Sequence, residues 1–284
     1  LSLEASREEP ALIVWPEAAT PRAINRDPDL LREIHHIAGD SDACLLVGST
    51  QVQKFSRGRS GGQPCYLNSA FLIPPQEKKI SGPKHYDKIR LLPFGEYTPL
   101  KDWIQWSCLG IIHFDNLEAG TKFTVFTTPD CRFGVTICWE NIFPGLVRQF
   151  VNRGAQFIIN ITNEAWFGRS SAPYQFLSMS VFRAVENGLF VVRCSNTGVS
   201  CIIDPHGRIV ARVNDRDGAD TFVEGTVTGS IIPGRSGTLY TRYGDWMAWV
   251  SLSLSCTALG AALMPDLKNR IFPEGKAEVL GRKA

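Results

Sequence analysis

A cysteine and a glutamate, Cys138 and Glu140, stand two positions apart at the end of a short apolar run. The run contains the β-branched residues Val135 and Ile137, which predicts a buried strand over residues 133–137. Apolar residues with helical spacing follow, so the thiol is expected at a strand-to-helix turn. Such a turn presents a side chain and free backbone N–H groups, which suits a nucleophile whose substrate develops an oxyanion. The alternative interpretation is a small buried hydrophobe.

Two other segments offer the charged groups that a thiol nucleophile needs. Glu17 ends an apolar strand predicted over residues 11–14, and Lys88 and Glu96 share one segment punctuated by proline and glycine. A free thiol, with a pKa of about 8.5, is mostly protonated at neutral pH, so a base or a cation must assist it. Glu17 is the candidate base. Lys88 would favour the thiolate and, with the backbone N–H of Trp139, would stabilise a tetrahedral oxyanion.

A glutamate, a lysine and a cysteine in this order resemble the Glu-Lys-Cys triad of the nitrilase superfamily. Within that superfamily, the segments after the cysteine resemble the catalytic domain of the apolipoprotein N-acyltransferases. These segments are Asn163–Gly168, Phe182–Gly188 and Asn196–Ser200. The resemblance runs from Leu12 to Gly244. It departs at Trp139, where the family often has tyrosine, and at Gln175-Phe176, where a Gln-His pair is common.

The resemblance implies a nitrilase-like four-layer αββα sandwich over residues 1–240, within the α/β class that alternating strands and helices already predict. It also implies a two-step acyl transfer. Cys138 would take a fatty acyl chain from a phospholipid as a thioester and pass it to the N-terminal amine of a diacylglyceryl-cysteine apolipoprotein. Glu96 and Glu140 match acidic positions of the family and are expected to position Lys88, Glu17 or the incoming amine. No cofactor is implied.

The predicted elements alternate along the chain. Asp27 is expected to cap a helix that begins at Pro28. The other elements, in chain order, are strands over 43–50 and 66–73 with a tip over 55–64, a strand over 156–161, a helix over 172–187, a strand over 189–193, and a hairpin over 199–211. The apolar segment 99–120 is expected to pack in the core or, on the resemblance, to form a lid over the site.

Residues 246–265 contain no charged residue. This stretch has about the 20 residues that a helix needs to cross a bilayer. Trp246 and Trp249 would anchor one end, and basic residues follow the other. The positive-inside rule then predicts a transmembrane helix, a cytoplasmic tail over 266–284, and a catalytic domain on the periplasmic side of the bacterial inner membrane. The alternative is a buried C-terminal helix.

Composition and charge argue against several further classes of function. The formal net charge is +2 and the basic residues are scattered, which argues against a nucleic-acid partner. The eight cysteines form no CxxC pair, and neither they nor the five histidines have zinc-ligand spacing, so no metal site is expected. Residues 1–9 do not have the pattern of a signal peptide. Members of the resembled family carry membrane helices and a first sheet strand before this point, so a fragment or a truncated relative is expected.

Two other functions fit the same residues. A soluble nitrilase-type amidase would use the triad on a small substrate with a C–N bond, with water as the second nucleophile. An inactive, truncated membrane-associated relative would only pack against or bind membrane proteins. The missing first strand motivates this alternative, because a sheet that lacks a strand exposes unpaired edges and need not fold alone.

Overall fold

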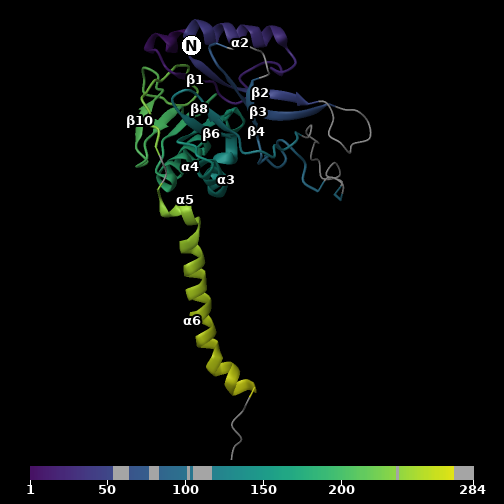
Figure 1. The fold of residues 1–284 in the computed structure, drawn as a ribbon. Coiled ribbons are helices and arrows are strands. Elements are labelled where there is room, and N and C mark those ends of the chain that lie inside the picture. The colour runs from purple at the N-terminus through teal and green to yellow at the C-terminus, as the bar shows by residue number, and fades with distance from the viewer. Residues whose placement is uncertain (54–63, 77–82, 101–102, 105–116, 235–236, 272–284) are drawn as a thin grey trace, which may run out of the picture. The chain divides into compact units, whose positions relative to one another are not determined.

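Two β-sheets lie face to face between layers of helices in this computed structural model (Figure 1). The structure describes residues 1–53, 64–76, 83–100, 103–104, 117–234 and 237–271. The chain forms two units, Leu1–Arg242 and Tyr243–Ala284. The first unit contains both sheets and every residue of the predicted site.

The first sheet has the strand order β1-β2-β3-β4. Its strands are β1 (Leu12–Val14), β2 (Cys44–Gln53), β3 (Cys65–Ile73) and β4 (Lys84–Asp87). β1 pairs in parallel with β2, whereas the pairs β2–β3 and β3–β4 are antiparallel. The short helices α1 (Ser2–Ala5) and η1 (Ser6–Glu8) precede this sheet.

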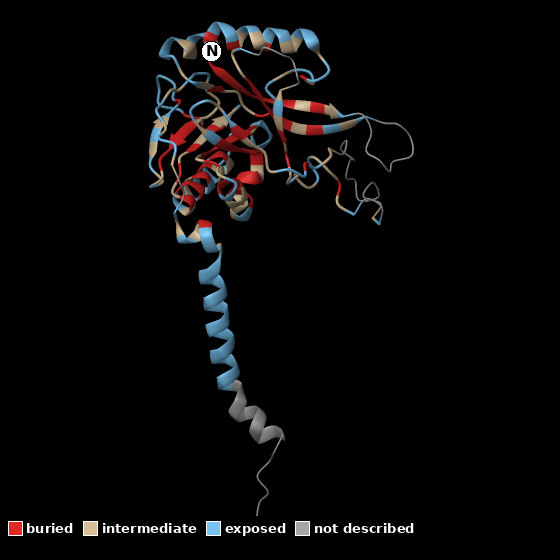
Figure 2. Ribbon diagram, viewed as in Figure 1, coloured by how far each residue is buried: buried red, intermediate tan, exposed pale blue. Residues whose placement is uncertain are grey.

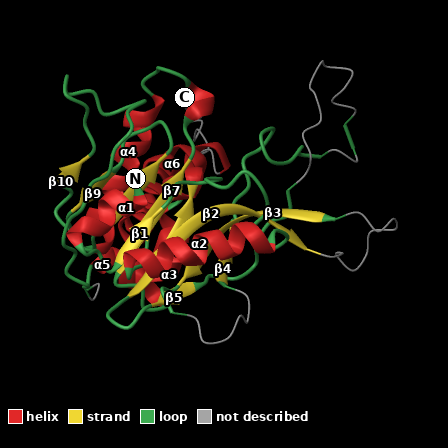
Figure 3. Ribbon diagram, turned by 90° about the horizontal axis from the view of Figure 1, so that it is seen from above, coloured by secondary structure: helices red, strands yellow, loops and turns green. Residues whose placement is uncertain are grey.

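Helix α2 (Pro28–Ser41) lies over the outer face of the first sheet (Figure 3). As predicted, Asp27 caps it, and the Asp27 carboxylate accepts a hydrogen bond of 3.0 Å from the backbone N–H of Leu30. The buried Ile34 and Ala38 pack against the outward side chains of the sheet. Because Pro28 supplies a preset first helical turn, the sequence starts this helix at one defined residue.

The second sheet has the strand order β10-β9-β8-β7-β6-β5. Its strands are β5 (Val125–Thr127), β6 (Arg132–Ile137), β7 (Phe157–Thr162), β8 (Val191–Ser195), β9 (Cys201–Ile203) and β10 (Ile209–Arg212). β6, β7 and β8 are parallel neighbours. The connecting helices α3 (Pro144–Asn152) and α4 (Ala172–Asn187) form the remaining helical layer (Figure 1). The predicted α/β sandwich is therefore confirmed.

Many of the residues on the strands of both sheets are buried (Figure 2). Side chains alternate along a strand, so one face of β2 and β3 meets α2 and the other meets the second sheet. Leu46, Ala70 and Leu72 belong to the cluster shared by the two sheets. Tyr86 also belongs to that cluster. Lys88, two residues further on, therefore continues on the inner side of the first sheet.

The predicted transmembrane helix over residues 246–265 is not supported. These residues do form a helix, α6 (Trp246–Ile271). However, among the residues that the structure describes, no helix combines the length and the apolarity needed to cross a membrane. Serine and threonine dilute the apolar side chains, and the hydroxyl groups of Ser253 and Thr257 donate to carbonyl oxygens four residues earlier.

Parts of three other predicted segments lie outside the described residues. These parts are 54–63 in the hairpin tip, 101–102 and 105–116 in the apolar segment, and 272–284 in the tail. Two observed strands, β4 and β5, were not predicted. Each is only three or four residues long, which is too short for an alternating pattern to stand out.

Candidate active site

Cys138 stands where strand β6 ends, as the sequence predicts. It is the first residue of a short 3₁₀ turn, Cys138–Ile142, which leads into helix α3. The cysteine is 9% exposed, and its φ angle is +56°. A residue with a Cβ pays roughly 1–3 kcal/mol to adopt this left-handed region, and such strain persists only where the surroundings enforce it. The backbone is therefore held so that the thiol points out of the strand end.

Glu17 follows β1 and is 6% exposed. One of its carboxylate oxygens, Oε2, accepts a hydrogen bond of 2.7 Å from the backbone N–H of Asn163. The other, Oε1, accepts one of 2.7 Å from the side-chain amide of Asn68 and lies 3.4 Å from Lys88 Nζ. These contacts come from both sheets, because Asn68 lies on β3 and Asn163 follows β7. The carboxylate is fixed at the seam between the sheets.

Lys88 is 1% exposed and lies between two carboxylates. Its Nζ atom is 2.8 Å from Glu96 Oε1 and 3.4 Å from Glu17 Oε1. Burial alone would lower the pKa of Lys88, but the charges of Glu17, Cys138 and Glu96 raise it above its ordinary value. Glu96 is itself held by the backbone N–H of Leu92, which donates a hydrogen bond of 2.7 Å. The site therefore contains a permanent buried cation.

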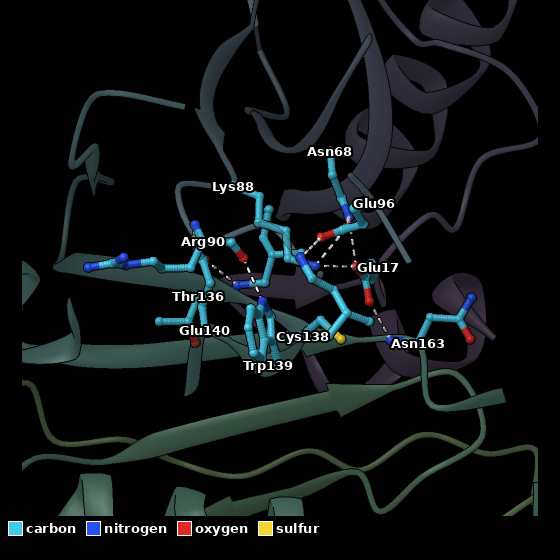
Figure 4. Close-up of polar contacts among 12 residues, drawn as sticks. Glu17, Asn68, Lys88, Arg90, Glu96, Thr136, Cys138, Trp139, Glu140 and Asn163 are labelled. Atoms are coloured by element: carbon cyan, nitrogen blue, oxygen red, sulfur yellow. Dashed lines mark hydrogen bonds and ion pairs between the residues drawn. The ribbon is translucent and has the colours of Figure 1, made fainter. Parts of the chain in front are cut away.

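The side chains of Glu17, Lys88 and Cys138 lie together in Figure 4. Burial and the charge of Glu17 raise the pKa of the Cys138 thiol to about 12, while Lys88 and a hydrogen bond with Thr162 act in the opposite direction. The resting thiol is consequently protonated at neutral pH. A thiol of this kind becomes a nucleophile only when a neighbouring base takes its proton, and Glu17 is the carboxylate placed beside it.

Glu140 is fully buried and contacts the backbone on both sides of the site. Its carboxylate accepts hydrogen bonds from the backbone N–H groups of Ile89, Arg90 and Ile137, at 2.7, 3.0 and 2.9 Å. The hydroxyl of Tyr86 donates to both of its oxygens at 2.9 Å. Burial raises the pKa of Glu140 to about 7, against the effect of these donors. Glu140 thus ties the residues after Lys88 to the strand before Cys138.

Trp139 makes a second connection between the turn at Cys138 and the segment after Lys88. Its indole N–H donates a hydrogen bond of 2.6 Å to the carbonyl oxygen of Arg90, and its ring meets that of Phe143 edge-on at 5.0 Å between centroids. A tyrosine ring could not make the indole hydrogen bond in the same way. The bond from the Trp139 side chain therefore ties the nucleophile turn to the segment after Lys88.

The sequence reasoning missed Asn68. Its amide N–H group donates to Glu17 Oε1 at 2.7 Å and to Glu96 Oε1 at 3.1 Å, and so bridges the two carboxylates. The backbone carbonyl oxygen of Asn68 also accepts a hydrogen bond of 2.8 Å from the backbone N–H of Lys88. A signal was present in the sequence: Asn68 stands in register with the inward residues Ala70 and Leu72, where a polar side chain is out of place unless it has a buried partner.

The turn that carries Glu17 packs directly on strand β2. A Cβ atom at Gly48 would lie 2.2 Å from the carbonyl oxygen of Pro16 and 2.8 Å from the Cα of Glu17. We therefore expect Gly48→Ala to displace this turn, at a cost of about 1–3 kcal/mol, and to lower the melting temperature by about 2–10 °C. Thermal denaturation measures the change.

Gly145→Ala is the matched control, because a Cβ atom at Gly145 would meet nothing within 4 Å. Because Gly145 lies in helix α3, where alanine is the better helix former, the melting temperature of this variant should equal or slightly exceed that of the parent chain. Equal melting temperatures for the two variants would show that the Glu17 turn is not packed against β2.

The arrangement has the parts of a nucleophilic acyl-transfer site: a protonated thiol, a carboxylate beside it and a permanent cation. The described residues contain no group of three His, Cys, Asp or Glu side chains that could hold a metal ion.

The chain is similar to proteins named apolipoprotein N-acyltransferase. It is 39% identical to the one from Geobacter metallireducens over 271 residues, which cover 95% of this chain and 48% of that protein. It is 36% identical to the one from Agrobacterium fabrum over 208 residues, or 72% of this chain and 38% of that protein. The one from Brucella melitensis is 33% identical over 263 residues, or 91% and 46%. The chain thus spans about half the length of these relatives or less.

Two solved structures share the fold. One is Saccharomyces cerevisiae Nit3, a member of branch 10 of the nitrilase superfamily, with a TM-score of 0.52 and 22% identity, covering 74% of this chain and 75% of that one. The other is a mutant amidase from Nesterenkonia sp. AN1, with acrylamide added to its active-site cysteine. Its TM-score is 0.56 and its identity 17%, over 88% of this chain and 89% of that one.

The chain also matches a family model over most of its length. The model described as carbon-nitrogen hydrolase matches residues 1–233, which include both sheets and the whole candidate site. On this match, and on the α/β sandwich that positions the site, the chain belongs to the carbon-nitrogen hydrolase family.

Proposed function

We propose that this chain carries out the N-acyl transfer step of bacterial lipoprotein maturation. The observation that carries the proposal is the buried cluster of Cys138, Glu17 and Lys88, in which the cation lies 3.4 Å from the candidate base. The relatives named apolipoprotein N-acyltransferase support the choice of reaction. The triad is the catalytic unit of the proposal, with Glu96, Trp139 and Glu140 in supporting positions.

The first step forms a thioester. The Cys138 sulfur attacks the ester carbonyl of a phospholipid, and Glu17 takes the thiol proton as the new C–S bond forms. The developing oxyanion is stabilised by Lys88 Nζ and the backbone N–H of Trp139. The C–O bond then breaks, the proton on Glu17 passes to the departing alkoxide, and a lysophospholipid leaves.

The second step forms an amide. The N-terminal amine of a diacylglyceryl-cysteine apolipoprotein attacks the thioester carbonyl, and Glu17 takes a proton from the amine. The C–S bond breaks, and the proton returns to the sulfur of Cys138, so the enzyme ends as it began. A thioester suits this order because it is reactive enough to acylate an amine.

The protonation state of the thiol supports the role of Glu17. A resting pKa of about 12 for Cys138 keeps the sulfur neutral until a substrate arrives, so proton transfer to a base is part of the attack. Lys88 would then serve the oxyanion more than the resting thiolate. Glu96, at 2.8 Å from Lys88 Nζ, would hold the ammonium group in place.

The chemistry of the proposed substrates indicates where in the cell the reaction would take place. A phospholipid donor and a lipid-modified acceptor both reside in a membrane, so the reaction would take place at the bilayer surface. We propose the periplasmic side of the bacterial inner membrane.

The test supplies both substrates at once. The chain is incubated in detergent with a phospholipid that carries a tagged acyl group and with a synthetic peptide that begins with diacylglyceryl-cysteine. The proposal expects the tagged acyl group on the peptide amine, detected by mass spectrometry, and none on a peptide whose amine is acetylated. Release of tagged fatty acid with no peptide product would instead indicate hydrolysis with water as the acceptor. No reaction of a folded chain would contradict both.

A further inference from the structure

A buried ion pair lies behind the candidate site and takes no part in the chemistry proposed above. The guanidinium group of Arg193, on strand β8, binds the carboxylate of Glu164, which follows strand β7. Their side chains are 0% and 1% exposed. Burying two charges is costly and gives little net stability, so stability alone does not account for this ion pair.

Arg193 fixes the orientation of a side chain beneath the nucleophile. Its Nη1 donates a hydrogen bond of 3.0 Å to Asn160 Oδ1. A guanidinium group has donors and no acceptor, so the amide oxygen of Asn160 must face Arg193. The amide N–H group then faces the end of β6, where it lies 3.2 Å from the carbonyl oxygen of Cys138 and also donates to the carbonyl and hydroxyl oxygens of Thr136 at 3.3 and 3.1 Å. This contact acts on the residue whose φ angle is +56°.

Glu164 acts on the other half of the site. The residue before it is Asn163, whose backbone N–H donates to Glu17 Oε2 at 2.7 Å. The carboxylate of Glu164 is wedged against Gly198, because a Cβ atom at Gly198 would lie 1.7 Å from Glu164 Oε2. Among the described residues, this Oε2 has no hydrogen-bond partner. The Arg193 contact at Oε1 is therefore the polar anchor of Glu164.

We propose that the Arg193–Glu164 ion pair is a positioning device that sets Cys138 and Glu17 relative to each other. Cys138 and Glu17 come from different sheets, and more than 100 residues of the chain separate them. The pair reaches Cys138 through Asn160 and Glu17 through Asn163. A catalytic role of the ion pair rests on the proposed acyl transfer, but its effect on the reactivity of the Cys138 thiol does not.

The first test compares three variants: Arg193→Met, Glu164→Met and the double variant. Each single variant leaves one buried charge without its partner, so its melting temperature should fall. The double variant leaves no lone charge and should recover most of that loss. If the pair positions the site, the double variant still lacks the group that orients Asn160. The Cys138 thiol is then no longer held beside Glu17, and its alkylation by iodoacetamide becomes faster, by about fivefold or more.

The rate is read at Cys138 by peptide mass spectrometry, with the buried Cys44, on strand β2 of the other sheet, as an internal reporter of unfolding. Recovery of both the melting temperature and the parent alkylation rate in the double variant would overturn the proposal, because the pair would then be structural only.

Gly198→Ala provides a second test that keeps both charges. The added methyl group would displace the Glu164 carboxylate, and it should speed the alkylation of Cys138 as the double variant does. Gly237→Ala is the matched control, since a Cβ atom there would meet nothing within 4 Å. Equal alkylation rates for Gly198→Ala and Gly237→Ala would count against the positioning role even if the double variant failed to fold.

The transfer assay separates this proposal from the proposed function. In acyl transfer, Gly198→Ala should lower kcat by about 10–100-fold with KM nearly unchanged, as expected for misplaced reacting groups. If the parent chain transfers no acyl group, the proposed function fails, and the alkylation rates still decide whether the ion pair positions the thiol.

Discussion

Glu17→Gln should abolish acyl transfer and, at the same time, make the thiol of Cys138 easier to alkylate. Loss of a general base costs about 10²–10⁴-fold in rate. The charge of Glu17 also raises the pKa of Cys138, which burial and this charge together bring to about 12. A neutral amide removes that contribution, so the pKa falls. The thiolate fraction at about pH 8 rises roughly tenfold for each unit by which the pKa of Cys138 falls.

Iodoacetamide labelling at Cys138 and the acyl-transfer rate are measured on the same preparation. Glu33→Gln, at an exposed position of α2, is the matched control and should change neither rate. Unfolding would also expose Cys138, but it would expose the buried Cys201 as well, so labelling of both thiols identifies that case. Slower labelling of Cys138 in Glu17→Gln would show that the two groups do not interact as described.

Lys88→Met should also abolish transfer, but with the opposite effect on the thiol. Loss of an oxyanion-stabilising group costs about 10²–10³-fold in rate. The charge of Lys88 lowers the pKa of Cys138, so its removal raises that pKa, and alkylation becomes slower than in the parent chain. The two variants thus share a loss of transfer and differ in the sign of the labelling change.

The lysine variant needs a companion, because its loss leaves Glu17 and Glu96 facing each other without a cation. Removing one member of a buried ion pair costs about 3–5 kcal/mol. The double variant Lys88→Met/Glu96→Gln also removes one of the two facing carboxylate charges. It should therefore be more stable than the single variant Lys88→Met. Lys122→Met, at an exposed lysine, is the control. Faster labelling of Cys138 in either Lys88 variant, with Cys201 still protected, would contradict the assignment of Lys88.

The sequence was sufficient to locate the strand-to-helix turn at Cys138 and the cap at Asp27, because both depend on residues close together in the chain. The observed bounds of α4, Ala172–Asn187, match the prediction for the same reason: Gly188 ends the helix in the left-handed conformation, with φ at +61°. The meeting of Glu17, Lys88 and Cys138 required the family resemblance. Contact between segments that are 50 or more residues apart leaves no local pattern in the sequence.

The positions of Asn68, Asn160 and Arg193 show what such patterns omit. Each stands inside a strand, where the alternation of apolar residues dominates the interpretation and a single polar residue is taken for an outward one. Only the packing of the two sheets reveals that Arg193 is 2% exposed and has acceptors within reach.

The C-terminal helix shows the converse error. Residues 246–265 contain no charge, and the prediction gave this absence more weight than the serine and threonine residues that dilute the apolarity of the stretch. Hydroxyl groups carry no charge but remain polar, and within the described residues the helix does not reach the apolarity of a membrane span. A count of charges alone is therefore a weaker criterion than mean hydropathy over the same window.

The most direct test of the account is the intact mass of the chain after incubation with a phospholipid whose acyl group carries a tag, without an acceptor. The account predicts that the parent gains one acyl group, that hydroxylamine removes it, and that Cys138→Ala gains none. An unmodified parent of native fold, or an adduct that persists in Cys138→Ala, would contradict the central claim that Cys138 forms a thioester with a lipid acyl chain.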